Sequence, residues 1–320
     1  MKAVVYEKYG GPEVLQIKEM DKPEVKSGEV LIKTGGSGIN PVDTYFRKGI
    51  RQVESFPHIP HFDIAGTVEA AGDNVPFVKE GDRVWATNVP GTGAEYVIAP
   101  AESVFPLPEH LTDADGAALA MPLMTAHLSL HYRARLQPDE TVLVYGGAGA
   151  VGNAAIQLAK ACGANVIATA GSKEKADICK EAGADSVILY KEENVVEKVN
   201  EITGGKGVHI ILDMSLSENL ESNLHMIETG GRIVTIGSPQ NNTPELPWRL
   251  LNQKHASLLG VLLFTAPKEE LRRAGEEITT LLEKKKIHSH IGKVFTFEEA
   301  AKAHRALENH EYNGSIVLTP

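Results

Sequence analysis

The sequence has only two cysteines, Cys162 and Cys179, among its 320 residues. Two thiols cannot form a disulfide framework, and they cannot supply a four-cysteine zinc site. Cysteine usage this low is typical of a reducing compartment, so we expect a cytoplasmic protein. The first eleven residues contain no apolar stretch of the length that a secretory signal peptide needs, because Glu7 interrupts them.

Long apolar runs are also scarce. Two uncharged stretches, 116–132 and 141–159, approach the length of a membrane span. The first contains Pro122 and two histidines, and the second contains four glycines together with Asn153 and Gln157. We therefore expect both stretches to be buried parts of a soluble fold.

Basic side chains are fewer than acidic ones, 32 against 42, which gives a net charge of −10. This balance opposes broad binding to a phosphate backbone, so a nucleic-acid partner is disfavoured as the main function. Hydrophobic residues make up 42% of the chain, which excludes disorder as its main state. The length favours two domains.

The chain divides into three sections by composition. Residues 1 to about 120 are rich in β-branched residues, glycine and proline, which predicts an antiparallel β domain. From about 124 to 263, short apolar strands alternate with helical patterns, which predicts parallel βαβ units. The last section has helical patterns at 268–286 and 298–308 and a final apolar strand at 315–318, which could return to the first domain.

Within the middle section the expected strands are 142–145, 166–168, 186–189, 208–213, 232–236 and 257–263. Helical patterns lie between them. Ser172 is expected to cap the N-terminus of one helix, and Gly163 and Gly183 are expected to end two helices.

A glycine-rich turn follows the first of these strands. The chain reads G-x-G-x-x-G from Gly147 to Gly152, directly after a strand and at the start of a helix. Gly147 is expected to form the tight turn, Gly149 to admit a pyrophosphate, and Gly152 to let the helix pack against the strand. Ala150 and Val151 then offer the free N–H groups of the helix start to the phosphates. The alternative is a tight turn that binds nothing; a P-loop is excluded, because no Gly-Lys-Ser/Thr follows.

The residues at the end of the second strand indicate which dinucleotide binds. NAD-binding units usually place an acidic residue there, whereas residues 169–172 read Thr-Ala-Gly-Ser. Lys173 and Lys175 follow in the first turn of a helix, where cations oppose the helix dipole. A bound 2′-phosphate explains both observations, so NADPH is favoured over NADH. The alternative is that the two lysines are solvated charges balanced in part by Glu174.

Several motifs together resemble the zeta-crystallin-like NADPH:quinone oxidoreductases, a zinc-free branch of the medium-chain dehydrogenase/reductase superfamily. The resemblance covers essentially the whole chain. Its motifs are Met1-Lys2-Ala3-Val4-Val5, Gly10-Gly11-Pro12-Glu13-Val14-Leu15, Gly38-Ile39-Asn40-Pro41-Val42-Asp43-Thr44-Tyr45, Asp63-Ile64-Ala65-Gly66, Gly81-Asp82-Arg83-Val84, the glycine turn, and Gly260-Val261-Leu262-Leu263-Phe264.

The resemblance implies an α/β fold with two domains. One is a GroES-like β domain built from both ends of the chain, residues 1–123 and 264–320, and the other is a doubly wound Rossmann domain with a parallel sheet, residues 124–263. The reaction would take place in the cleft between them. Relatives form dimers or tetramers, and the strand expected at 257–263 could lie at a sheet edge, so we expect a homo-oligomer.

The resemblance also implies site residues that local patterns do not reveal. Asn40 and Thr125 line the nicotinamide side, and Tyr45 faces the substrate, so Asn40 and Tyr45 are the expected catalytic residues. The alternative for Tyr45 is a packed aromatic ring with a satisfied hydroxyl group. The adenosine 2′-phosphate would be held at Gly171, Lys175 and Tyr190. Ser172 is a further expected cofactor-binding residue, and Ser238, Phe264 and Thr265 would lie at the edge of the cofactor site.

No metal is expected. Zinc-dependent relatives have a Cys, a Gly-His-Glu segment and a further Cys or acid, and the corresponding positions here are Asn40, Phe62 and the region of Met121. His58 and His61 lie close in sequence, but the prolines beside them indicate ordinary loop histidines. Without a Lewis acid, alcohol oxidation is disfavoured.

The expected function is therefore NADPH-dependent reduction of a small-molecule quinone. A related enzyme that reduces the C=C bond of an enone or enal would use the same cofactor and fold, and this alternative stays open. A third alternative, RNA binding, is known for some zeta-crystallin-like proteins, but the acidic charge and the lack of a basic aromatic stripe oppose it.

Overall fold

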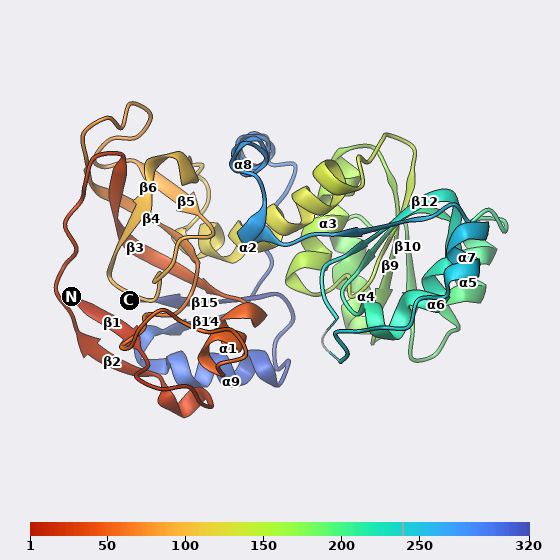
Figure 1. Cartoon of the computed structure of the whole chain (residues 1–320). Helices are drawn as coiled ribbons and strands as arrows, with labels where there is room; N and C mark the ends of the chain where they lie inside the picture. Colours follow the sequence, from red (N-terminus) through yellow and green to blue (C-terminus); the bar gives the residue numbers. More distant parts are fainter. Residues whose placement is uncertain (239) are drawn as a thin grey trace. The chain divides into compact units, whose positions relative to one another are not determined.

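The computed structural model describes residues 1–238 and 240–320. By its internal contacts the chain divides into two compact units. The first unit consists of Met1–Met124 and Leu271–Pro320, and the second consists of Thr125–Glu270 (Figure 1). Both ends of the sequence therefore fold into one unit, and the segment between them forms the other.

The first unit is mainly a β structure. Its strands are β1 (Lys2–Val5), β2 (Gln16–Glu19), β3 (Glu29–Ile39), β4 (Asp63–Ala71), β5 (Arg83–Ala86), β6 (Tyr96–Pro100), β7 (Val104–Pro106), β14 (Ile291–Thr296) and β15 (Ser315–Thr319). Its helices are α1 (Pro41–Arg47) and α9 (Ala300–Glu308), with short 3₁₀ turns at η1 (Pro12–Val14), η2 (Ala101–Ser103) and η5 (Phe297–Glu299). Two longer helices, α2 (Asp113–His127) and α8 (Lys268–Glu283), cross the boundary between the units.

The main sheet of this unit has the order β14-β15-β3-β4-β5-β7, and β6 pairs with β3. All of these pairs are antiparallel except β14 with β15. Ile316 of β15 is opposite Ile39 of β3, so the end of the chain does return to the first section, as the sequence suggested. Alternating apolar residues of β3 and β4, such as Val30, Ile32 and Ile64, are fully buried and form part of the core.

The second unit alternates strands and helices. Its strands are β8 (Thr141–Val144), β9 (Asn165–Ala170), β10 (Ser186–Leu189), β11 (Val208–Asp213), β12 (Ile227–Thr235) and β13 (Ser257–Gly260). Its helices are α3 (Ala150–Ala161), α4 (Lys173–Glu181), α5 (Val195–Ile202), α6 (Leu216–Met226) and α7 (Trp248–Gln253), with a π-helical turn at η3 (Leu128–Arg133) and a 3₁₀ turn at η4 (Leu263–Thr265).

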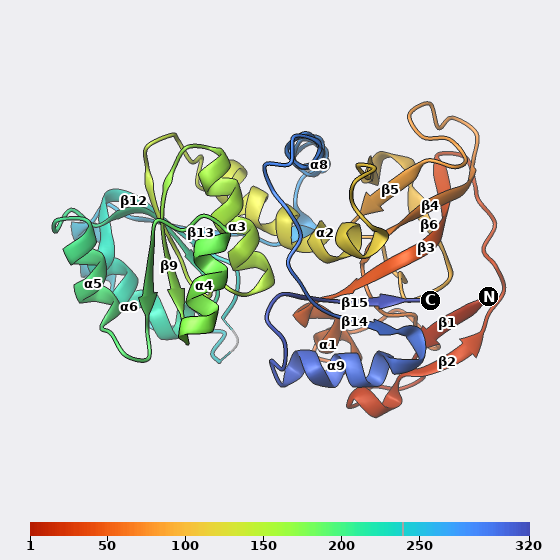
Figure 2. The same ribbon diagram turned by 180° about the vertical axis from the view of Figure 1, so that it is seen from behind.

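These strands form one parallel sheet with the order β10-β9-β8-β11-β12-β13. Helices α3 and α4 pack together on one face and α5 and α6 on the other (Figure 2). The order reverses beside β8, which is the topological switch point where doubly wound folds bind ligands. The central strands are buried on both faces, as Leu143, Ile167 and Ile211 show.

Most expected elements of the second unit are present, with shifted ends. One of the helices expected between the strands is α6, Leu216–Met226, and Ile227 begins β12 because its backbone is extended. The strand expected at 257–263 stops at Gly260, since η4 begins at Leu263. Gly163 and Gly183 both have the positive φ that ends a helix. Among the described residues, no helix combines the length and apolarity that crossing a membrane requires.

Candidate active site

The glycine turn lies at the carboxyl end of β8, and Thr169 of β9 holds it. The N–H of Gly146 donates to Thr169 Oγ1 (3.1 Å), and the N–H of Gly147 donates to the Thr169 carbonyl oxygen (3.0 Å). The positive φ of the turn, +62°, is at Gly146. The N–H of Gly149 donates to the Gly146 carbonyl oxygen (2.9 Å), so Gly147 lies at the centre of a tight turn, as expected. Gly147 must also be small, since a Cβ there would lie 2.7 Å from Cys179 Sγ.

Helix α3 begins directly after this turn. A Cβ on Gly152 would overlap the carbonyl oxygen of Gly146, so only glycine lets the helix pack this closely, as expected. Gly149 is the N-cap residue and has an extended backbone. The N–H groups of Ala150 and Val151 in the first turn have no partner within the helix, so they are available to an anion.

The carboxyl end of β9 brings together residues assigned to the 2′-phosphate. The hydroxyl group of Tyr190, which follows β10, lies against Gly171, and a Cβ on Gly171 would lie 2.8 Å from Tyr190 Oη. Ser172 Oγ accepts from the N–H of Lys175 (3.3 Å), so the expected N-cap is confirmed. The Tyr190 ring is exposed, and the Lys175 side chain is half-buried. No acidic side chain occupies the strand end.

Other expected cofactor residues lie in separate segments. Thr125 is near the end of α2, and its carbonyl oxygen accepts from Ser129 Oγ (2.7 Å). Ser238 follows β12, donates to the Asn241 carbonyl oxygen (2.5 Å) and accepts from the Ser217 N–H (3.2 Å). Phe264 and Thr265 form most of the η4 turn. The hydrogen bond of Thr125 is local, whereas that between Ser238 and Ser217 joins two different segments.

Asn40 is the N-cap residue of α1, between β3 and the helix. Its N–H donates to Asp43 Oδ2 (2.6 Å), and its side-chain amino group donates to Asp63 Oδ2 (2.7 Å). Asp63 also accepts from Thr87 Oγ1 (2.5 Å) and from the N–H of Met121 (3.1 Å). In the sequence, Asp63 stands out only as part of a motif. Its carboxyl group is fully buried, and this burial raises its pKa to about 7.

Tyr45 lies on α1 and is half-buried. Its carbonyl oxygen accepts from the N–H groups of Ile50 (3.0 Å) and Arg51 (3.2 Å), so the chain folds back over the end of the helix. Among the described residues its hydroxyl group has no hydrogen-bond partner, which leaves the group available to a ligand.

His61 is not the ordinary loop histidine that the sequence indicated. Its ring is buried, and its Nε2 atom is 2.8 Å from His304 Nε2 of α9. Nδ1 of His304 faces the guanidinium group of Arg47 (3.0 Å), and Nδ1 of His61 faces Ser37 Oγ (3.2 Å). The His58 ring instead packs against Tyr6 (5.3 Å between centroids). Among the described residues, no group of three or more His, Cys, Asp or Glu side chains is arranged to hold a metal ion.

Another buried carboxyl group lies beside the switch point. Asp213, at the end of β11, accepts from the side-chain amino groups of Asn219 (3.0 Å) and Asn223 (2.6 Å). Tyr145 Oη in turn donates to Asn223 Oδ1 (3.0 Å), so this network holds the residue that precedes the glycine turn. Burial raises the pKa of both Asp213 and Tyr145.

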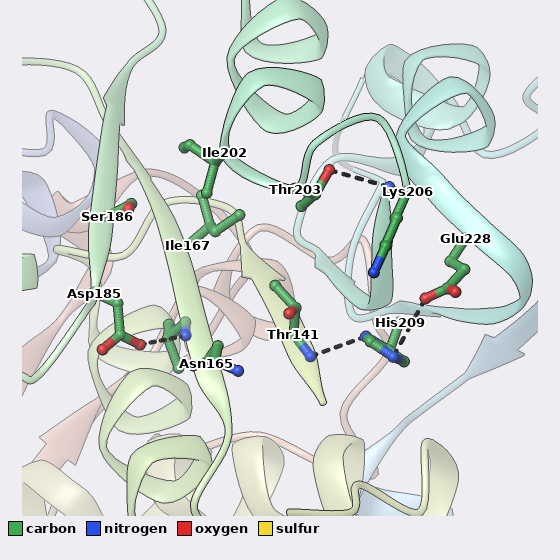
Figure 3. Close-up of a pocket in the computed structure, with 12 residues that line it drawn as sticks. Thr141, Asn165, Ile167, Asp185, Ser186, Ile202, Thr203, Lys206, His209 and Glu228 are labelled. Carbon is green, nitrogen blue, oxygen red and sulfur yellow. Dashed lines mark hydrogen bonds and ion pairs between the residues drawn. The ribbon is translucent and has the colours of Figure 1, made fainter. Parts of the chain in front are cut away.

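The second unit also has a cavity of about 400 Å³ at the amino-terminal ends of strands β8 to β11, opposite the end that carries the glycine turn (Figure 3). His209 Nδ1 accepts from the Thr141 N–H (3.0 Å), and its Nε2 is 3.2 Å from Glu228. Asp185 pairs with Lys160 (2.8 Å). No expected site residue lines this cavity, and it lies away from the glycine turn.

Comparison with known proteins identifies the family. Residues 26–109 match the alcohol dehydrogenase GroES-like domain, and residues 150–280 match the zinc-binding dehydrogenase domain. A quinone oxidoreductase from Sus scrofa is 37% identical over 322 residues, which cover 99% of this chain and 97% of the relative. The chain belongs to the quinone oxidoreductase family. It is therefore an oxidoreductase of the medium-chain dehydrogenase/reductase superfamily, and the expected family and fold class are confirmed.

Solved structures match the chain over its full length. Escherichia coli quinone oxidoreductase in complex with NADPH matches with a TM-score of 0.89 at 32% identity, covering 100% of both chains. A structure described as an NAD-dependent alcohol dehydrogenase matches with a TM-score of 0.92 at 30% identity, again over 100% of both chains. Since relatives with different cofactors share this fold, the choice of cofactor has to be argued from side chains.

Proposed function

We propose that this family member transfers a hydride from NADPH to a quinone and that it needs no metal ion. The observation that carries the cofactor assignment is the carboxyl end of β9. It leads into Gly171 and Ser172 instead of an acidic residue, Tyr190 Oη lies against Gly171, and Lys175 follows in the first helical turn. An acidic residue would accept the ribose hydroxyls of NAD, whereas a hydroxyl group, a lysine and a helix N-terminus suit a phosphate dianion.

The rest of the cofactor is assigned to the glycine turn and to residues of other segments. The pyrophosphate would bind at Gly149 and at the N–H groups of Ala150 and Val151, where Gly147 and Gly152 allow close approach. Thr125 and Asn40 would contact the nicotinamide, with Ser238, Phe264 and Thr265 around it. The bound cofactor supplies a hydride, and the protein residues orient it and exclude water.

The metal-free assignment rests on side-chain chemistry at the positions that hold zinc in zinc-dependent relatives. Phe62 offers only a hydrocarbon ring, which cannot be a ligand. Asn40 offers a neutral carboxamide instead of a cysteine thiolate, and its side-chain amino group already donates to Asp63 Oδ2. A quinone is reduced readily without a Lewis acid, whereas alcohol oxidation would need one. Dialysis against a chelator should therefore leave the rate unchanged.

Tyr45 is the proposed contact to the acceptor. Its free hydroxyl group would donate to a quinone oxygen. That oxygen becomes more basic as the quinone accepts the hydride. Unchanged turnover of Tyr45→Phe on every acceptor would remove this role.

We retain the domain bounds 1–123 with 264–320 and 124–263 as part of the proposal, together with a small-molecule partner and a homo-oligomer.

The acceptor class is tested by following the loss of NADPH absorbance with a para-quinone and, in parallel, with an enone. The proposal expects fast oxidation with the quinone and slow oxidation with the enone. Oxidation with the enone alone would keep the cofactor assignment and move the function to C=C reduction. Oxidation with neither acceptor would contradict the proposal.

A further inference from the structure

Asp63 receives hydrogen bonds from two different kinds of donor. The Asn40 amino group (2.7 Å) and the Met121 N–H (3.1 Å) both donate to Oδ2, and these groups can only donate. The Thr87 hydroxyl group meets the other oxygen, Oδ1 (2.5 Å), and a hydroxyl group can either donate or accept. The two oxygens of this carboxyl group are therefore not equivalent.

This difference decides where Asp63 can hold a proton. A proton on Oδ2 would face two N–H groups, and one of them would have to leave. A proton on Oδ1 faces Thr87 Oγ1, which becomes the acceptor once its own hydrogen turns away. The Asn40 amino group can thus keep its bond to Oδ2 in both protonation states.

Both states matter near neutral pH, because burial raises the pKa of Asp63 to about 7. The titratable group that faces this cluster is Asp43 on α1, and its pKa is raised by burial and by the charge of Asp63. Among the described residues, no Lys, Arg or His side chain hydrogen-bonds to Asp63. The partners of Asp63 therefore have to tolerate its charge and its proton alike.

We propose that Asp63 is the positioning residue for Asn40, and that Thr87 lets it hold the Asn40 carboxamide in one orientation whether or not Asp63 carries a proton. This inference rests on the proposed function in assigning Asn40 a contact with the nicotinamide. A carboxamide that rotates by half a turn exchanges a donor for an acceptor, so a ligand in contact with it would lose its match. Asp63 and Thr87 would hold the Asn40 carboxamide in the orientation that the ligand needs, without contacting the ligand themselves.

Substitutions at Asp63 separate this role from simple structural support. Asp63→Asn imitates the protonated acid, because its oxygen can replace Oδ2 and its amino group can donate to Thr87. It should keep kcat/KM for NADPH within about threefold of wild type. Asp63→Ala leaves the donors of Asn40 and Met121 without a partner, and kcat/KM should fall about tenfold or more.

Thr87→Val tests the second part of the proposal. The valine side chain cannot accept a proton from Oδ1, so protonation of Asp63 would disturb the bond to Asn40. Loss of the Thr87 hydrogen bond raises the pKa of Asp63 above its wild-type value of about 7, so the kcat/KM of this variant should fall progressively between about pH 9 and about pH 6, relative to wild type. Thr34→Val is the matched control, since Thr34 is also buried and its hydroxyl group donates to the Ala94 carbonyl oxygen (2.5 Å), not to a carboxyl group. The ratio of its kcat/KM to that of wild type should not change with pH.

A second readout needs no cofactor. The side-chain amide signals of Asn40, identified by their loss in Asn40→Asp, are followed by NMR in the unliganded full chain. The Asn40 side-chain proton that is hydrogen-bonded to Asp63 should stay protected from exchange at both ends of this pH range in wild type and in Asp63→Asn. It should lose protection in Asp63→Ala, and in Thr87→Val at the lower pH.

The two readouts distinguish the two claims. If wild type fails to oxidise NADPH but the protection pattern is as expected, the proposed function is wrong and the positioning role stands. If Thr87→Val matches Thr34→Val at every pH, or if Asp63→Asn is as impaired as Asp63→Ala, the positioning role is wrong.

Discussion

The rings of His61 and His304 stack at 5.1 Å, and their Nε2 atoms lie 2.8 Å apart, although 243 positions separate them in the sequence. Arg47 can only donate, so His304 Nδ1 must accept and the proton of His304 sits on Nε2. That proton is donated to His61 Nε2, which leaves the proton of His61 on Nδ1, facing Ser37. Both rings are therefore neutral, in agreement with pKa values that burial lowers, to about 3 for His61.

Acid should destabilise the fold through this pair. Below about pH 6.5 the unfolded chain takes up protons that the folded rings do not, so the free energy of unfolding falls as the pH drops toward the folded pKa of His61, about 3. His304→Gln keeps an acceptor for Arg47 and a donor for His61 but removes one titrating ring. Its free energy of unfolding should fall less steeply than that of wild type, by about 1.4 kcal/mol per pH unit.

Urea unfolding between about pH 6 and about pH 4.5 measures this difference. Asp63 has the opposite effect, since its raised pKa favours the folded state at low pH, but it is present in both proteins and cancels. His310→Gln, which removes an exposed ring just beyond α9, is the control for loss of a histidine. Parallel curves for wild type and His304→Gln would contradict the tautomer assignment.

Alanine substitutions at two glycines of the turn should separate the effect on cofactor binding from the effect on stability. A Cβ on Gly149 would meet only the Gly146 carbonyl oxygen, at 3.3 Å, so Gly149→Ala should fold with little loss of stability and yet bind NADPH weakly. Gly152→Ala overlaps that same oxygen and should also lose about 1–3 kcal/mol of unfolding free energy. Thermal melts and fluorescence titration with NADPH measure both effects. Equal stability loss in the two variants would contradict the account.

Charge at Lys175 should decide between the two cofactors. Lys175→Gln should lower kcat/KM for NADPH by about tenfold and leave that for NADH nearly unchanged, because only NADPH carries the 2′-phosphate. Lys180→Gln, on the same helix and paired with Asp177 (3.5 Å), is the matched control and should change neither value. An equal loss for both cofactors in Lys175→Gln would place the 2′-phosphate elsewhere.

Strand β13 lies at one edge of the parallel sheet. The Val261 N–H donates inward to the Thr235 carbonyl oxygen (3.3 Å), and alternate residues of a parallel ladder face the same neighbour, so the Leu258 N–H points outward. If this edge joins two copies, Leu258→Pro should convert an oligomer to a folded monomer in light scattering, whereas Val261→Pro would break the inner ladder. If the oligomer persists in Leu258→Pro, its interface lies on another surface.

Local chemistry is what made part of the site predictable from the sequence. The glycine turn, the Ser172 cap and the glycines that end helices each depend on neighbours within a few residues, so their pattern carries the structure. Even here the pattern did not reveal the positive φ of Gly146, which lies one residue before the motif.

The buried polar clusters could not be predicted in this way. Asp63 meets Asn40, Thr87 and Met121, and His61 meets His304, only after strands and helices from distant segments pack together. A lone aspartate or histidine in an apolar run was the available signal. It shows that a buried polar group needs partners, but it does not name them.

The central claim is that NADPH reduces a quinone on this protein. The most direct measurement is the initial rate of NADPH and of NADH oxidation with the same para-quinone, for wild type at one pH. The account predicts rapid quinone-dependent oxidation of NADPH, with a kcat/KM about tenfold or more above that for NADH. Equal or faster oxidation of NADH, or no quinone-dependent oxidation of NADPH, would contradict it.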